Sequence, residues 1–150
     1  MSEWGTTSEL YRASYRSMLR VAFSLTGDTA AAEDAVHDAF CAVGPRIGTI
    51  DDPLPYLRVA VVNRCRSMHR KAERAQRHAA AQRFDDVDSH GLADFADALD
   101  RLTFPQRTAI VLRYQCDLAD DEIADILTCR PATVRSHVRR GLTHLRKDLS

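Results

Sequence analysis

Apolar residues recur at intervals of three and four positions over most of the chain, which is the pattern of amphipathic α-helices. The first such run covers about Ser8 to Leu25 and stops before Gly27. Asp28 or Thr29 can cap a second helix, which is predicted to extend to about Val43. No strand-like alternation of useful length occurs, so the pattern predicts an all-α fold.

Gly44 and Pro45 interrupt the helical pattern, and the segment from Gly48 to Pro55 is too rich in Gly, Pro and Asp to continue it. A third long helix is predicted from about Leu54 to Arg74. Its Val59–Val62 run is apolar nearly all round, as expected of a segment that is covered on more than one side.

The next segment, residues 75–91, has no sustained apolar period and is predicted to be a linker. A short helix from Leu92 to Leu102 and another that starts at Pro105 are predicted beyond it. The expected organisation is therefore two small helical domains, residues 8–74 and 92–150, joined by a flexible linker.

The C-terminal part predicts a helix-turn-helix. Glu122–Leu127 presents an apolar face, Thr128–Arg130 forms the turn, and Pro131 suits the first turn of a second helix. Val134 and Val138 then face inward. The side chains left facing outward can reach phosphates and base edges, and they are Arg130, Thr133, Arg135, Ser136, Arg139 and Arg140. An ordinary helical hairpin with a solvated basic face is the alternative.

The formal net charge is zero, but charges of opposite sign are sorted into blocks. Arg58 to Arg83 holds eight Arg or Lys residues and one acid, and Arg130 to Lys147 holds six basic residues and no acid. Between them, Asp85 to Asp125 holds eleven acids against three arginines. Two basic segments separated by an acidic one indicate two contacts with a polyanion, each weakened by salt. Charge runs on helices are usually only solvated faces.

Composition and motifs argue against several classes of protein, including membrane proteins and enzymes. The longest apolar runs are far too short to cross a bilayer, and the polar N-terminus has no signal-peptide pattern, so a cytoplasmic location without membrane insertion is expected. The four cysteines are widely spaced and are expected to be reduced, structural thiols. No Gly-rich phosphate loop, zinc-protease motif or nucleophile elbow is present, so neither an enzyme nor a cofactor is expected.

One constellation suggests a metal. His37 with Cys41 and Cys65 with His69 are both i, i+4 pairs on adjacent predicted helices. Four such ligands could bind zinc tetrahedrally, but spacing does not show that the two faces meet. We therefore predict no metal site.

In their order, these segments resemble the extracytoplasmic-function sigma factors, group 4 of the sigma-70 family, which contain only the second and fourth sigma domains. Leu25–Asp28 and Ala32–Phe40 look like the segment that docks on core RNA polymerase. Pro55–Arg64 is similar to the helix that contacts and opens the −10 element. Leu102–Arg113 and Glu122–Arg140 resemble the domain that binds the −35 element.

The resemblance implies a sigma factor that binds core RNA polymerase and promoter DNA, with an anti-sigma factor, often membrane-anchored, as a further partner. The expected polymerase contacts are Glu33, Asp34, His37 and Asp38; three of them also share one helical face by spacing, although that could be a solvated acidic surface. For the −10 element we expect the loop from about Arg46 to Pro53 and residues Asn63, Arg64, Arg66, Arg70 and Lys71. For the −35 element we expect Arg130, Pro131, Thr133, Arg135, Ser136, Arg139 and Arg140.

The chain departs from the family pattern at three places. Thr128 stands where the turn usually has Gly, and Val43 or Gly44 stands near a usual Trp. Ser67 occupies a neighbourhood that often holds an acid. Two other classes compete with the resemblance: a helix-turn-helix regulator of the LuxR type that needs no polymerase docking, and an interaction module that sequesters a partner.

Overall fold

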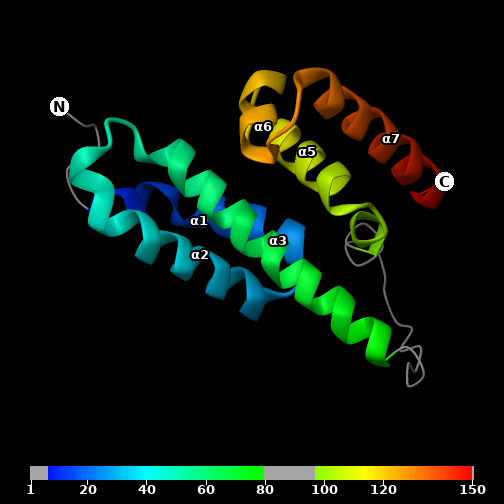
Figure 1. Ribbon diagram of the computed structural model, residues 1–150, viewed down its shortest axis with the longest axis horizontal. Helices are drawn as coiled ribbons and strands as arrows, with labels where there is room; N and C mark the ends of the chain where they lie inside the picture. Colours follow the sequence, from blue (N-terminus) through cyan, green and yellow to red (C-terminus); the bar gives the residue numbers. More distant parts are fainter. Residues whose placement is uncertain (1–6, 80–96, 150) are drawn as a thin grey trace. The chain divides into compact units, whose positions relative to one another are not determined.

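The computed structural model describes residues 7–79 and 97–149 and contains helices without a strand over those ranges, which confirms the all-α prediction (Figure 1). It divides into two compact units, residues 1–65 and 66–150, with the longest helix crossing the boundary. None of the described helices is long and apolar enough to span a membrane.

The first unit contains α1 (Thr7–Thr26), α2 (Thr29–Val43), the 3₁₀ helix η1 (Gly44–Thr49) and the first part of α3 (Pro53–Ala79). Gly27 adopts a φ of 70° at the end of α1, a conformation that costs glycine little. The predicted cap of α2 is confirmed, since the backbone N–H of the third residue after Asp28 donates to its carboxylate.

Small residues allow α1 and α2 to pack closely, and Ala22, Ala32 and Ala35 are fully buried where these helices meet. From α3, Leu57 and Val61 are also fully buried. Complete burial of a Leu or Val side chain stabilises the fold by about 1.5–3 kcal/mol, so this apolar core holds the helices together.

Two predicted boundaries differ from the structure. The chain break at Gly44 ends α2, but a short 3₁₀ helix follows where only an irregular loop was expected. Also, α3 continues to Ala79, five residues into the predicted linker. Those five residues include good helix formers and no Gly or Pro, so the helix does not end where its apolar period ends. The rest of the predicted linker lies outside the described residues.

The second unit contains a helical turn at residues 97–100, α5 (Phe104–Tyr114), α6 (Asp120–Leu127) and α7 (Pro131–Leu149). The described part of the predicted 92–102 helix is thus helical at residues 97–100. Thr103 and Gln106 form a reciprocal capping box that starts α5 one residue before the predicted Pro105.

The predicted helix-turn-helix is confirmed as α6, a turn and α7. Thr128 ends α6 in the left-handed conformation, with φ 56° and ψ 52°, and Cys129 donates a backbone hydrogen bond to Ala124 across the turn. On α7, Val134 and Val138 are buried as predicted, which fixes the helix face that remains outside.

Candidate polymerase and promoter interfaces

The predicted polymerase contacts share the outer face of α2. Glu33, Asp34 and His37 are exposed and Asp38 is half-buried, while the opposite face of the helix is buried. Burial of the apolar face fixes the rotation of α2 and therefore presents the acidic residues to a partner. This side carries three carboxylates and one imidazole, a composition suited to a basic surface.

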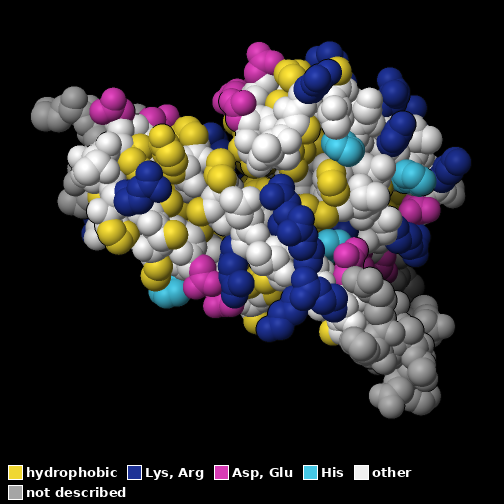
Figure 2. Space-filling model, viewed as in Figure 1, with side chains coloured by type: hydrophobic (Ala, Val, Ile, Leu, Met, Phe, Trp, Pro, Cys, Tyr) yellow, Lys and Arg dark blue, Asp and Glu magenta, His cyan; other side chains and the backbone are white. Residues whose placement is uncertain are grey.

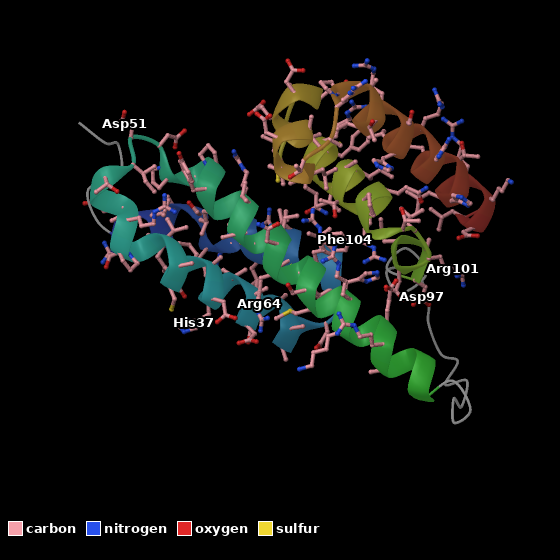
Figure 3. All side chains as sticks on the ribbon, viewed as in Figure 1. His37, Asp51, Arg64, Asp97, Arg101 and Phe104 are labelled. Carbon is pink, nitrogen blue, oxygen red and sulfur yellow. The ribbon has the colours of Figure 1, made fainter. Side chains whose placement is uncertain are left out.

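Arg64 connects this acidic face to α3, and the two helices meet at its side chain (Figure 3). Its Nε donates to Asp38 Oδ2 at 2.8 Å, and its Nη2 lies 3.6 Å from Asp34 Oδ2. All three side chains are partly exposed, so the pairs contribute little to stability. The pairs instead fix the positions of the carboxylates, because one guanidinium orients two of the predicted polymerase contacts.

The predicted −10 residues of α3 occupy adjoining faces of this helix. Asn63, Arg66 and Arg70 follow i, i+3, i+7 spacing, with Lys71 beside Arg70. Asn63, Arg70 and Lys71 are exposed and Arg66 is half-buried. Arg66, Arg70 and Lys71 give this part of α3 a basic surface, whereas the fifth predicted residue, Arg64, is held by the carboxylates of α2.

Arg46 comes from η1, and its guanidinium carbon lies 5.7 Å from the ring centroid of Tyr56 at the start of α3. Tyr56 is half exposed, so the ring has an accessible surface. An exposed aromatic ring beside an arginine is a combination that single-stranded nucleic acid binds by stacking and charge. Tyr56 lies within the predicted −10 helix but was not among its predicted contacts, although an aromatic residue next to Pro55 in a polar stretch was a usable signal.

The predicted −35 residues lie along the outer side of α7, where Lys and Arg side chains follow the helix (Figure 2). The arginines of this set are exposed, and Pro131, Thr133 and Ser136 are half-buried. Arg130 also starts the helix, since its carbonyl accepts from Thr133 and Val134 N–H groups. The structure therefore leaves the whole predicted set at least partly exposed, with Arg130 in the turn and the other six residues on α7.

Two acid–base contacts of one carboxylate connect α6 to α5 and to α7. Asp120, the first residue of α6, pairs through Oδ1 with Arg113 of α5, and its Oδ2 lies 3.5 Å from Arg135 Nη1 on α7. Sequence reasoning missed Asp120 and Arg113 because the contact joins three helices and leaves no local signal.

His137 lies on the same helix, half-buried between the apolar and basic sides. Burial lowers the pKa of His137 below its ordinary value, and the positive charge of Arg140 lowers it further. The imidazole is therefore neutral at pH 7, and the positive charge of this face comes from the arginines.

The paired His and Cys residues do not form a metal centre in the structure. His37 Nε2 lies 3.6 Å from Cys41 Sγ, but the described part of the chain contains no group of three or more His, Cys, Asp or Glu side chains placed to hold an ion. Cys65 is buried, and burial raises the pKa of its thiol to about 12.

Two family models match the chain, and together they account for most of it. Residues 10–75 match sigma-70 region 2, and residues 92–145 match sigma-70 region 4. The chain belongs to the sigma-70 family. The sixteen residues between the two matches leave no room for another sigma domain, which is the arrangement of the extracytoplasmic-function group.

Solved structures have the same fold. The sigma factor RpoE of Bartonella quintana, determined in complex with the anti-sigma factor NepR, aligns with a TM-score of 0.79 and 24% identity over 95% of each chain. CnrH, determined in complex with the cytosolic domain of CnrY, aligns with a TM-score of 0.72 and 21% identity over 95% of this chain and 86% of CnrH. No curated protein sequence matches the chain.

The protein is thus a sigma factor, which binds core RNA polymerase and promoter DNA to start transcription. The match over residues 10–75 disfavours the LuxR-type alternative, because that half of the chain has a sigma-factor counterpart. Sigma factors are initiation factors and the phosphodiester chemistry belongs to the polymerase.

Proposed function

We propose that the two predicted domains divide the work of promoter-specific initiation, with residues 8–74 binding polymerase and the −10 element, residues 75–91 joining the domains, and residues 92–150 binding the −35 element. The observation that carries the division is the placement of an exposed acidic face on α2 and an exposed arginine-rich face on α7. An acidic face suits a protein partner and repels DNA, whereas an arginine-rich face attracts phosphates. A cytoplasmic location follows from these partners.

The outer face of α2 is the proposed polymerase contact, made by Glu33, Asp34, His37 and Asp38. Arg64 neutralises part of this face and holds two carboxylates in fixed positions. We assign Arg64 to organisation of the polymerase contact in addition to the −10 surface, since its Nε is already engaged by Asp38.

The −10 element is proposed to meet Arg46 and Tyr56 first and then the exposed side of α3. Promoter opening exposes unpaired bases, and base stacking on an aromatic ring is worth about 1–3 kcal/mol per base. Tyr56 supplies the ring, Asn63 offers both hydrogen-bond donors and an acceptor, and Arg70 with Lys71 supplies charge for the phosphates.

The −35 element is proposed to bind α7 in the major groove of duplex DNA. The first two turns of this helix carry Pro131, Thr133, Arg135 and Ser136, which would reach base edges, with Arg130 at the turn. Arg139 and Arg140 lie farther along and suit phosphates. One bidentate arginine–guanine pair supplies about 1–3 kcal/mol of base discrimination.

An anti-sigma factor is proposed as a regulatory partner. Its support is the fold shared with RpoE and CnrH, each solved in complex with another protein, NepR or CnrY. A partner that covers the α2 face or the α7 face would prevent initiation without any change in the chain itself.

The polymerase contact is tested with the double variant Asp34→Asn and Asp38→Asn. Asparagine is chosen because arginine at both positions would place two further cations beside Arg64. The measurement is binding of the full-length protein to sigma-free core polymerase, and a loss of at least about tenfold, or 1.4 kcal/mol, is expected.

The matched control is Asp121→Asn with Asp125→Asn, an exposed i, i+4 acidic pair on α6. This control should keep polymerase affinity within about twofold. Equal affinities of the α2 variant and the unmodified protein, with both folded by circular dichroism, would rule out the α2 face as the contact.

A further inference from the structure

Asp120 occupies a central position in the helix-turn-helix unit. It begins α6, and its two carboxylate oxygens point to different helices: Oδ1 pairs with Arg113 of α5, and Oδ2 lies 3.5 Å from Nη1 of Arg135 on α7. Only 23% of the Asp120 side chain is exposed, against 59% of the Arg135 side chain. The acid is thus mostly enclosed, and the arginine it contacts is largely open to a ligand.

The two arginines have different surroundings. Arg113 is 28% exposed and sits on the last turn of α5, so its pairing fixes the carboxylate relative to the helical scaffold. Arg135 extends from the outer face of α7 and uses one terminal nitrogen toward Asp120. Because a guanidinium has five N–H donors, the other donors of Arg135 stay available to DNA.

Contact with a fixed carboxylate restricts the orientation of the Arg135 guanidinium. A free arginine side chain loses rotamer entropy when it is ordered, and it can follow any nearby phosphate. A guanidinium already oriented by an acid loses less on binding and presents its donors along a fixed direction. Bidentate recognition of guanine requires such a direction, whereas phosphate binding does not.

We propose that Asp120 is a specificity-determining positioning residue, which orients Arg135 toward a base edge of the −35 element through a carboxylate anchored by Arg113. This inference rests on the proposed role of α7 in DNA recognition. It adds that an acid outside the recognition helix decides which base Arg135 reads.

The experiment measures −35 base preference with the full-length protein and core polymerase on promoters randomised over the −35 element. Arg135→Ala identifies the position that Arg135 reads, and a loss of about 5- to 100-fold in preference is expected there. Asp120→Asn is expected to reduce preference at the same position by about 3- to 30-fold and to leave the other positions within about twofold.

The matched control is Asp121→Asn, which removes the same charge from the next residue of α6, where the side chain is exposed. It should change affinity for all promoters uniformly, as loss of a negative charge near DNA does. A uniform change in the Asp120→Asn protein as well would overturn the proposal and reduce the role of Asp120 to general electrostatics.

Asp120→Glu separates position from charge and covers the case in which Asp120→Asn does not fold. Glutamate keeps the negative charge but moves the carboxylate by one methylene group. A positioning role requires changed preference at the position read by Arg135, and wild-type preference in the glutamate variant would overturn it. If Arg135→Ala itself leaves every preference unchanged, the assignment of Arg135 to base reading in the proposed function has failed, and the inference falls with it.

Discussion

Arg107 is a charged residue inside the second unit, with only 2% of its side chain exposed. Its Nε donates to the carbonyl of Leu99 at 2.8 Å, and its Nη2 donates to the carbonyls of Asp100 and Leu102 at 3.0 and 3.1 Å. Burial lowers the pKa of Arg107, and the negative charge of Asp100 opposes that shift. An arginine side chain keeps its charge in proteins, and this guanidinium satisfies carbonyls at the end of the helical turn 97–100.

Removal of this side chain should destabilise the second unit strongly. Arg107→Ala removes three hydrogen bonds to carbonyls, and a hydrogen bond to a charged group contributes about 1.5–3 kcal/mol, so a loss of at least about 3 kcal/mol is expected. Urea unfolding of the full chain measures it. The control is Arg101→Ala, which removes an exposed arginine whose surface pair with Asp148 contributes below about 1 kcal/mol. Equal losses in the two variants would contradict the role given to Arg107.

Cys65 and Cys41 should differ in reactivity because one is buried and the other exposed. With its pKa raised to about 12, Cys65 has only about one thiolate in ten thousand molecules at pH 8. Alkylation with iodoacetamide at pH 8, followed by mass spectrometry, should modify Cys41 in the folded protein and leave Cys65 unmodified until urea is added. Modification of Cys65 at the rate of Cys41 in the folded protein would contradict this expectation.

At the scale of elements, the sequence predicted most helices because burial requires a periodic apolar face. The cap at Asp28 and the inward positions Val134 and Val138 follow from local rules, and the structure agrees with them. The end of α3 at Ala79 was missed because helix propensity, not burial, sustains its last turns. The left-handed Thr128 was expected only as a departure from glycine, since a sequence does not reveal whether a turn accepts a positive φ.

Close approach of α7 to α5 depends on Gly141, which is buried. A Cβ at this position would lie 2.5 Å from Ile110 Cδ1, while the next nearest atom, Gln106 Cβ, is at 3.5 Å. A glycine in a helix costs about 1 kcal/mol relative to alanine. Glycine is nevertheless the residue that fits here, because a larger side chain would collide with α5.

The collision can be isolated with a double-mutant cycle. Ile110→Val removes the Cδ1 atom that a Cβ at position 141 would meet. Gly141→Ala should therefore be more favourable by about 1–2 kcal/mol when Val occupies position 110 than when Ile does, because overpacking costs about 1–3 kcal/mol. Urea unfolding of the four proteins gives the coupling. If the effects of the two substitutions on the free energy of unfolding add within about 0.5 kcal/mol, the proposed contact between positions 141 and 110 is contradicted, because α5 and α7 can then move apart to relieve it.

The candidate site was predictable from sequence where its residues lie on one helix. Spacing alone grouped the acids of α2 and the arginines of α7, and the structure leaves both groups outside. The contacts Arg64 with Asp38 and Asp120 with Arg135 were not predictable, because they join different helices and depend on how those helices pack. Sequence spacing thus finds the surfaces, and only tertiary structure shows which charges orient one another.

At the scale of the whole molecule, a net charge of zero conceals two basic segments, for which we propose separate tasks. Phosphate contacts raise affinity for every sequence, whereas base contacts distinguish one promoter from another. The exposed pair Arg70 and Lys71 on α3 is assigned to phosphates, so its removal should affect salt dependence without affecting sequence preference.

The measurement is binding of the sigma–core complex to one promoter over a range of salt concentrations. Each lost phosphate contact reduces the slope of log affinity against log salt by about 0.7–0.9, so Arg70→Gln with Lys71→Gln should lower it by about 1.5. Arg12→Gln with Arg16→Gln, which removes two exposed arginines from α1, should leave the slope unchanged. If both double variants lower the slope equally, then the basic run of α3 acts only through the total charge of the protein. If only the α3 variant does, and its −10 base preference is retained, then the phosphates are held by this helix while the bases are read by other residues.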